Sequence, residues 1–232
     1  MGIFRWKKSA STGGDWLLVG LGNPGLQYER SRHNCGYMAL DRLAKQLGLS
    51  FDRRRFRSLY ALGRLDGRRL HLLKPETYMN LSGEAVTEAA RFFKIPPEQV
   101  LVFYDDIDID LGLCRLRMEG GPGTHNGMRS IVQQLGSTAF PRLRLGIGPQ
   151  DRRLDLADFV LGKLQAEELK SLDQALERAV AAALLLLQGR AEEAAQRANV
   201  RPGKPRPIKK ATEEGSAAVQ PGSRDSSARE RS

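Results

Sequence analysis

Apolar segments of two periodicities alternate along this chain, and this alternation restricts the fold more than any other feature. Continuous apolar runs, typical of strands buried on both faces, lie at 17–20 and 100–104. Apolar residues recur every three or four positions over 35–47, 82–93 and 165–188, as on one face of a helix. Strands that alternate with helices pack into layers. The sequence therefore predicts an α/β fold: a single three-layer domain with a mixed, twisted sheet flanked by helices.

Shorter segments complete the predicted sheet and its helices. Asp66-Gly67 separates two apolar runs and is typical of the turn of a β-hairpin. Gly189 follows the last long helical period and marks its end. We expect hairpin strands at 58–65 and 69–74, further strands at 113–118 and 143–148, and helices near 126–135 and up to about 198.

The two ends of the chain differ in composition from the part between them. From residue 201 onward Lys, Arg, Pro, Gly and Ser dominate and no apolar period remains, which is typical of disorder. The first fourteen residues are basic and contain no acidic residue, a weak and short similarity to an organellar transit peptide. We predict a disordered basic arm over 1–15, one domain over 16–200, and a disordered basic tail over 201–232.

The formal net charge of +10 suits a polyanionic partner such as nucleic acid or anionic lipid, and a generally basic proteome is the alternative explanation. Cys35 and Cys114 build no disulfide framework, and no Cys/His spacing typical of a metal site occurs. The longest apolar run, 179–187, is about half of the ~20 residues that a membrane span requires. We therefore expect a cytoplasmic protein that does not enter a membrane.

A turn with three glycines and Pro24 follows the first predicted strand, and Asn23, Tyr28 and His33 lie within and just after it. Open α/β folds bind their ligands at this edge of the sheet. Imidazole is the side chain best suited to proton transfer near neutral pH, and the chain has only three histidines. The stretch therefore predicts a functional site.

Two motif matches fail on their surroundings. Residues 20–25 spell G-x-G-x-x-G, but a dinucleotide site needs a helix that opens at the third glycine, and here about ten polar residues intervene. Residues 106–110 resemble the start of a calcium loop, but Leu111 and Arg117 stand where Gly and Glu are required. The sequence therefore disfavours a dinucleotide site and excludes a calcium loop.

Four further segments carry polar side chains next to predicted strand ends; they offer Tyr78, Asn80, Asp105, His125, Asn126 and Arg144. A carboxylate on one ring nitrogen makes a histidine a better base, and carboxamides donate to a developing oxyanion. No G-x-S-x-G nucleophile motif occurs, so water would attack an activated acyl bond. Taken singly, each segment is also explained as a turn or a helix cap.

Four motifs occur in a fixed order: G-L-G-N-P-G-x-x-Y-x-x-x-R-H-N, K-P-x-T-Y-M-N-x-S-G, D-D-I-D and G-T-H-N-G. Together they resemble the bacterial-type peptidyl-tRNA hydrolase family over about residues 16–198. The resemblance implies cleavage of the ester between a peptide and the 3′-terminal ribose of tRNA, by a monomer that uses no cofactor and no metal ion.

The resemblance also implies a role for each matching residue. His33 would be the base that activates water, Asp105 would stabilise its protonated form, and Asn23 would distinguish blocked from unblocked aminoacyl groups. Position 117 is commonly Lys in that family, so Arg117 keeps the charge with a different geometry. Tyr28, Tyr78, Asn80 and Asn126 would bind the peptidyl and 3′-terminal parts of the substrate, and Arg117 and Arg144 would meet the tRNA 5′-phosphate.

Two other functions remain possible from the sequence. One is a non-catalytic RNA-binding member of the same fold, similar to plant organellar splicing factors; retention of His33, Asp105 and the three asparagines argues against it. The other is a general esterase of small substrates, which the basic charge and the missing nucleophile motif disfavour.

Overall fold

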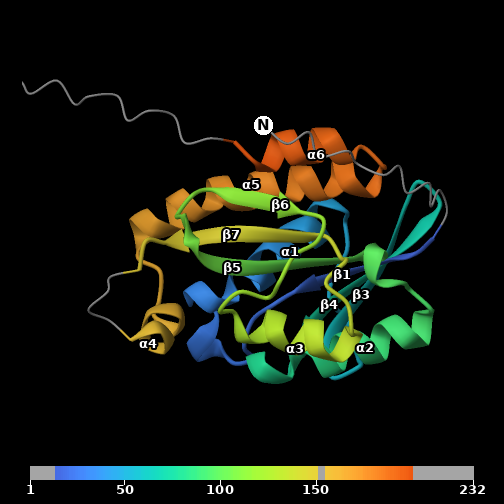
Figure 1. The fold of residues 1–232 in the computed structure, drawn as a ribbon, viewed down its shortest axis with the longest axis horizontal. Helices are drawn as coiled ribbons and strands as arrows, with labels where there is room; N and C mark the ends of the chain where they lie inside the picture. The colour runs from blue at the N-terminus through green and yellow to red at the C-terminus, as the bar shows by residue number, and fades with distance from the viewer. Residues whose placement is uncertain (1–13, 151–154, 201–232) are drawn as a thin grey trace, which may run out of the picture. The chain divides into compact units, whose positions relative to one another are not determined.

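The computed structural model describes residues 14–150 and 155–200, which form one sheet with helices on both faces (Figure 1). The strands are β1 (Trp16–Gly20), β2 (Arg53–Arg55), β3 (Ser58–Leu65), β4 (Arg68–Pro75), β5 (Val100–Asp110), β6 (Cys114–Arg117) and β7 (Arg142–Gly148), in the order β2-β3-β4-β1-β5-β7-β6. The central strands β4, β1, β5 and β7 are parallel, and the others pair antiparallel. The sheet is therefore mixed, as the sequence predicts.

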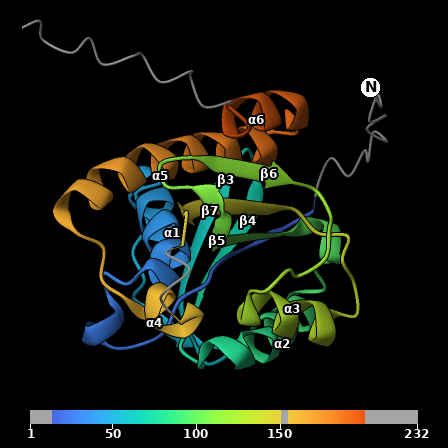
Figure 2. The same ribbon diagram turned by 60° about the vertical axis from the view of Figure 1, so that its left-hand side comes forward.

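Helices cover the sheet in two layers (Figures 1 and 2). One layer contains α1 (Cys35–Gln46), α5 (Ala166–Leu187) and α6 (Ala191–Ala198), and the other contains α2 (Ser82–Phe93) and α3 (Asn126–Leu135). The short α4 (Leu156–Leu161) lies at one end of the sheet, on the left of Figure 1. The predicted three-layer α/β architecture is confirmed.

Successive residues of the central strands face opposite layers, and both layers are buried. Leu18, Leu101 and Phe103 pack with the α1 and α5 side, whereas Leu17, Val19 and Val102 pack with the α2 and α3 side, and all are fully buried. Burial on both faces explains why these strands appear in the sequence as continuous apolar runs.

Two glycines allow α1 to begin directly against the sheet. A Cβ atom on Gly36 would lie 2.3 Å from the carbonyl oxygen of Phe103, and one on Gly20 would lie 2.5 Å from the carbonyl oxygen of Gly36. Neither distance is compatible with a side chain. These glycines therefore bring the start of α1, and His33 just before it, against the ends of β1 and β5.

The structure adds elements that the sequence pattern does not predict. β2 is an exposed edge strand of three arginines, and α4 has only six residues, so neither carries a readable apolar period. β5 continues to Asp110 because its pairing with β7 resumes after a register shift. Asp105, which we expected just beyond a strand end, therefore lies within a strand.

Four 3₁₀ helices occur among the described residues, and three of them shape the loops near the strand ends. They are η1 (Leu26–Tyr28), η2 (Arg32–Asn34), η3 (Met79–Leu81) and η4 (Pro97–Gln99). The predicted arm, apart from Gly14 and Asp15, and the predicted tail lie outside the described residues. No helix in the described part is long and apolar enough to cross a membrane.

Candidate active site

A cavity of about 890 Å³ lies where the loops after β1 and β4 meet the middle of β5. This position matches the rule that open α/β sheets bind ligands at the carboxyl ends of their parallel strands. All ten residues that the sequence singles out line it: Asn23, Tyr28, His33, Tyr78, Asn80, Asp105, Arg117, His125, Asn126 and Arg144. Segments separated by more than 100 residues thus contribute to one site.

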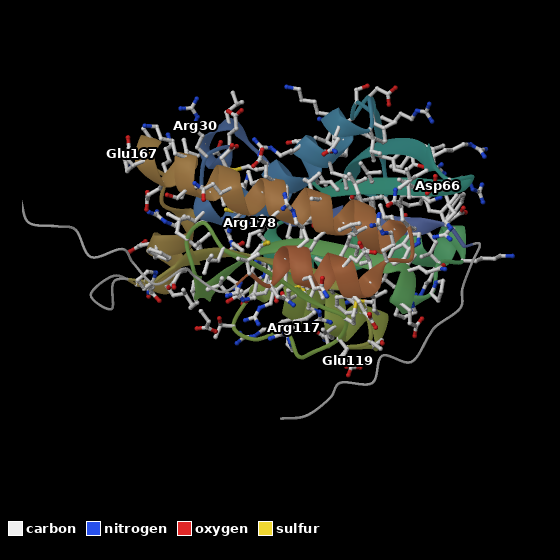
Figure 3. All side chains as sticks on the ribbon, turned by 90° about the horizontal axis from the view of Figure 1, so that it is seen from above. Arg30, Asp66, Arg117, Glu119, Glu167 and Arg178 are labelled. Carbon is white, nitrogen blue, oxygen red and sulfur yellow. The ribbon has the colours of Figure 1, made fainter. Side chains whose placement is uncertain are left out.

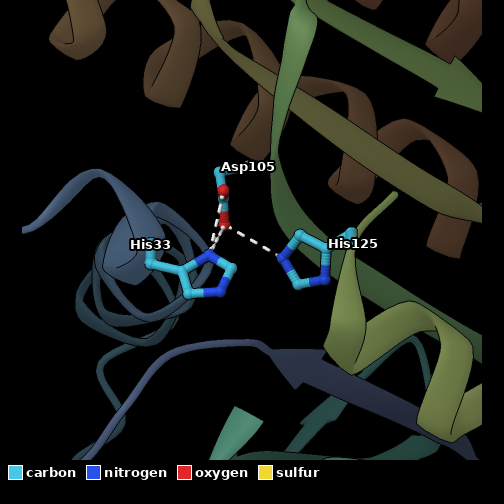
Figure 4. A group of neighbouring side chains, drawn as sticks. All are labelled: His33, Asp105 and His125. Atoms are coloured by element: carbon cyan, nitrogen blue, oxygen red, sulfur yellow. Dashed lines mark hydrogen bonds and ion pairs between the residues drawn. The ribbon is translucent and has the colours of Figure 1, made fainter. Parts of the chain in front are cut away.

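His33, Asp105 and His125 line this cavity and form a hydrogen-bonded group (Figure 4). The Nδ1 atom of His33 lies 3.0 Å from each carboxylate oxygen of Asp105, and the Nε2 atom of His125 lies 3.0 Å from Oδ1 of the same residue. The two imidazole centroids are 4.8 Å apart. Asp105 is 2% exposed, so its charge is compensated by these neighbours and not by solvent.

The hydrogen bonds assign a proton to each imidazole. The Nδ1 atom of His125 accepts the backbone N–H of Met128 at 3.3 Å and caps α3, so its Nε2 carries the proton donated to Asp105. His33 donates its Nδ1–H to the same carboxylate. Its Nε2 atom is then an unprotonated acceptor, and no hydrogen bond within the described residues ends on it. Of the two histidines, His33 alone offers a free basic nitrogen to the cavity.

Charge and burial act in opposite directions on this group. Burial alone would raise the pKa of Asp105, but the two imidazoles outweigh it and hold that pKa well below its usual range. Burial alone would lower the pKa of His33, but the Asp105 carboxylate raises it above the ordinary value. Asp105 is thus ionised at neutral pH and strengthens His33 as a base.

The nearby Cys35 thiol is not suited to nucleophilic attack. It is fully buried, and burial, reinforced by Asp105, raises the pKa of Cys35 well above its usual range.

The same three residues offer ligand atoms within 4.8 Å of one another, as a metal site would. A metal ligand must present a lone pair, however, and the hydrogen bond from Met128 places the proton of His125 on Nε2. His33, Asp105 and His125 are therefore better suited to hydrogen bonding with one another than to binding a metal ion.

The side-chain amide of Asn23 has a fixed orientation. Its Oδ1 accepts the backbone N–H of Met79 at 3.1 Å, so its Nδ2 is left as a donor at the cavity wall. Asn34 holds the backbone of Asn23 from both sides, since its Oδ1 accepts the Asn23 N–H at 2.8 Å and its Nδ2 donates to the Asn23 carbonyl at 3.0 Å. Asn34 is a functional residue that the sequence reasoning missed; its place directly after His33 was the available signal.

The other carboxamides come from two segments that pack against each other. Asn80 lies in η3 and Asn126 is the first residue of α3. A Cβ atom on Gly127 would lie 2.6 Å from the sulfur of Met79, so the contact between these segments depends on that glycine. Tyr78, 67% exposed, and the half-buried Tyr28 in η1 lie at the mouth of the cavity.

Four arginines lie on the paired strands β6 and β7, where Arg115 is opposite Arg144 and Arg117 is opposite Arg142. Arg142 is buried, so the like charges are not all presented on one surface. Arg144 donates Nε–H to Asp106 at 2.6 Å. Arg117 is exposed and forms no ion pair within the described residues. Asp106 and Arg142 are site residues that the sequence reasoning did not single out.

This chain is similar to known proteins over most of its length. A family model described as peptidyl-tRNA hydrolase matches residues 17–207. The peptidyl-tRNA hydrolase of Caldanaerobacter subterraneus subsp. tengcongensis is 48% identical over 185 residues, which are 79% of this chain and 99% of that protein. The one from Chloroflexus aurantiacus is 49% identical over 174 residues, 75% of this chain and 93% of that protein.

Solved structures show the same similarity. The crystal structure of peptidyl-tRNA hydrolase from Acinetobacter baumannii superposes with a TM-score of 0.75 at 37% identity, covering 80% of this chain and 94% of that one. Its Arg119Gln mutant superposes with a TM-score of 0.74. The family model and the relatives cover most of the chain, and the shared fold brings the site residues to one cavity. This chain is therefore a member of the peptidyl-tRNA hydrolase family.

Proposed function

We propose that water activated by His33 is the nucleophile with which this enzyme hydrolyses peptidyl-tRNA. The observation that carries the proposal is the free Nε2 atom of His33 at the cavity, on a ring whose Nδ1–H is held by Asp105. This is the arrangement that general-base catalysis requires. The family membership supplies the substrate, an ester between the C-terminal carboxyl of a peptide and the 3′-terminal ribose of tRNA.

The reaction then proceeds in two proton transfers. His33 Nε2 takes a proton from water as the water oxygen attacks the ester carbonyl carbon, and Asp105 stabilises the imidazolium that forms. When the tetrahedral intermediate collapses, the imidazolium returns its proton to the departing ribose oxygen. The products are a free peptide carboxylate and a tRNA with a free 3′-terminal hydroxyl, and the scheme needs neither a covalent intermediate nor a cofactor.

The three carboxamides bind the reacting part of the substrate in this scheme. Asn23, whose Nδ2 is directed to the cavity by its bond to Met79, donates to the carbonyl oxygen as negative charge develops there. Asn80 and Asn126 hold the peptide and the terminal nucleotide from the opposite wall. Tyr28 and Tyr78 offer aromatic faces at the mouth for the peptidyl and 3′-terminal groups.

Arg117 and Arg144 bind tRNA phosphate in the proposed complex. Phosphate contacts position a nucleic acid without reading its sequence, which lets one enzyme act on many tRNAs. Arg144 shares its charge with Asp106, so the exposed Arg117 contributes the larger part of the attraction. The proposal includes a monomer that acts in the cytoplasm with tRNA as its partner.

The direct test measures hydrolysis of N-acetyl-aminoacyl-tRNA with and without hydroxylamine. We expect free tRNA and N-acetyl-amino acid from the wild-type chain and little turnover of the unblocked aminoacyl-tRNA. Attack by water gives no acyl hydroxamate at the rate of turnover. Hydroxamate formed in proportion to turnover would reveal an acyl-enzyme and contradict the proposed role of water.

A further inference from the structure

Arg142 is a buried cation that the scheme above does not use. Its side chain borders the cavity, yet the residue is only 1% exposed. Within residues 14–150 and 155–200 no carboxylate pairs with it. A buried charge without a counter-charge is costly unless every donor is satisfied, so its retention beside the site calls for a role.

All five N–H donors of the guanidinium are used by backbone carbonyls. Nη1 donates to the carbonyl of Gly120 at 2.5 Å and to that of Gly121 at 3.1 Å. Nη2 donates to Thr138 at 2.9 Å, and both Nη2 and Nε donate to Phe140 at 3.3 Å. The guanidinium also lies over the Phe140 ring, 4.1 Å from its centroid. No N–H group of Arg142 remains to donate to a phosphate, so its role differs from the phosphate binding proposed for Arg144.

The four carbonyls belong to two different connections. Gly120 and Gly121 begin the glycine-rich loop from β6 to α3, and Thr138 and Phe140 lie between α3 and β7. Arg142 therefore ties the start of the loop to the segment before β7. In this segment Phe140 is fully buried, and the Thr138 carbonyl also accepts the backbone N–H of Gly120 at 3.2 Å. The loop contains glycines with φ of +148° at Gly120 and +60° at Gly123, so its own backbone imposes little restraint.

This loop delivers two residues to the site. It ends at His125, whose Nε2–H donates to Asp105, and at Asn126, the first residue of α3. We propose that Arg142 is a positioning residue, which clamps the glycine loop so that His125 reaches Asp105 and Asn126 faces the substrate. The inference rests on the proposed function of His33 and its carboxylate. It assigns Arg142 an effect on turnover and none on the salt-dependent phosphate contacts with tRNA.

The test compares Arg142→Lys and Arg142→Gln with the wild-type chain on N-acetyl-aminoacyl-tRNA. Lysine keeps the charge but has three donors in another geometry, so it cannot tie both connections. A misplacement of about 1 Å in a catalytic group costs up to about 10²-fold in rate, and we expect a loss of that order in kcat with the salt dependence of KM unchanged. Arg178→Lys is the matched control, because Arg178 donates to the Gly112 carbonyl from α5, outside the cavity (Figure 3).

A double variant tests whether Arg142 acts through the loop. If it does, Arg142→Lys combined with His125→Ala loses less kcat than the product of the two single losses. Losses that multiply would show that Arg142 acts independently of the loop and would overturn the inference.

Two other results would also overturn it. A salt-dependent rise in KM at constant kcat would make Arg142 a phosphate contact. Loss of the melting transition in both the Lys and the Gln variant would make it a core residue only. Absence of hydrolysis by the wild-type chain, in contrast, would contradict the proposed function itself.

Discussion

At the scale of single residues, Asp105 accepts hydrogen bonds from two histidines that have different second partners. The Nδ1 atom of His125 accepts a hydrogen bond as the cap of α3, whereas the Nε2 atom of His33 has no partner among residues 14–150 and 155–200. The carboxylate is buried and ionised, and it raises the pKa of His33. One acid thus fixes the position of the loop histidine and increases the basicity of the other.

Asp105→Asn should change both the rate and its pH dependence. The neutral imidazole is the base, so kcat/KM rises as pH increases through the pKa of His33, which Asp105 holds above its usual value of ~6.5. Removing the carboxylate lowers that pKa and shifts the acid limb to lower pH. The variant also no longer holds His33 in the tautomer that carries its proton on Nδ1. The plateau of kcat/KM should therefore fall by about 10²–10⁴-fold.

A pH–rate profile of kcat/KM checks this, with Asp66→Asn as the matched control. Asp66 is exposed in the turn between β3 and β4, at φ +49°, which asparagine tolerates well. The control should follow the wild-type profile. An acid limb of Asp105→Asn at the wild-type position would show that Asp105 does not set the pKa of His33.

Asn23→Asp separates the two functions of the Asn23 side chain. Aspartate keeps the oxygen that accepts the Met79 N–H, so the melting temperature should stay near that of the wild type. It removes the Nδ2 donor and adds a negative charge, which should lower kcat/KM by about 10²–10³-fold. Asn199→Asp is the control, since the Asn199 Oδ1 accepts the Leu116 N–H away from the cavity. Activity retained in Asn23→Asp would remove Asn23 from the proposed mechanism.

The sequence could predict which segments follow the strand ends. Asn23, His33 and Asn80 belong to the segments after β1 and β4, and the structure places all three around one cavity, while their roles remain a prediction. The relations between residues needed the fold. His125 caps α3 through a residue 3 positions away, Asn34 holds Asn23 across 11 positions, and Arg142 bonds to Gly120 across 22. The spacing of these residues in the sequence does not specify the geometry of these contacts.

At the scale of elements, the antiparallel pair of β6 and β7 carries positive charge at one side of the cavity. Its four arginines face each other across the strands, and Asp106 of β5 neutralises only Arg144. Figure 3 shows Arg117 and Glu119 projecting along the same edge of the molecule. Of this strand pair, Arg117 is exposed and has no ion-pair partner in the part of the chain that the structure describes.

Arg117→Ala should raise KM for a tRNA substrate and leave a minimal ester substrate nearly unaffected. The increase should be largest at low salt, and the slope of log KM against log salt should fall by about one, as expected for one lost phosphate contact. Arg64→Ala, which removes an exposed arginine from β3, controls for net charge. Equal losses on both substrates would assign Arg117 to the fold instead of the tRNA.

Element boundaries were predictable where burial on two faces or a helical period dominates the sequence. The bounds of α2, α3 and β3 agree with the prediction to the residue. β2 and α4 were not predictable, because three exposed arginines and a six-residue helix carry no period. The last residues of β5 are polar and pair only because β7 lies beside them, which is tertiary information.

At the scale of the whole molecule, the basic charge is spread over the domain and both predicted arms. The segment 201–232 has eight Lys or Arg against four Asp or Glu and lacks an apolar period. Deleting it should leave the melting transition and kcat unchanged. The segment has too few apolar residues to offset the conformational entropy that it would lose on packing against the domain. KM should rise modestly at low salt and match the full chain at moderate salt. A collapsed melting transition, or a KM change that salt does not remove, would show a specific role for the tail.

The central claim is that His33 activates water, and the comparison of wild type with His33→Ala on N-acetyl-aminoacyl-tRNA tests it most directly. Single-turnover rates at saturating enzyme isolate the chemical step, and equilibrium binding of tRNA confirms that the variant is folded. We expect the rate to fall by about 10²–10⁴-fold with tRNA affinity unchanged. A variant that binds tRNA normally and retains more than about a tenth of the wild-type rate would contradict the assignment of His33 as the base.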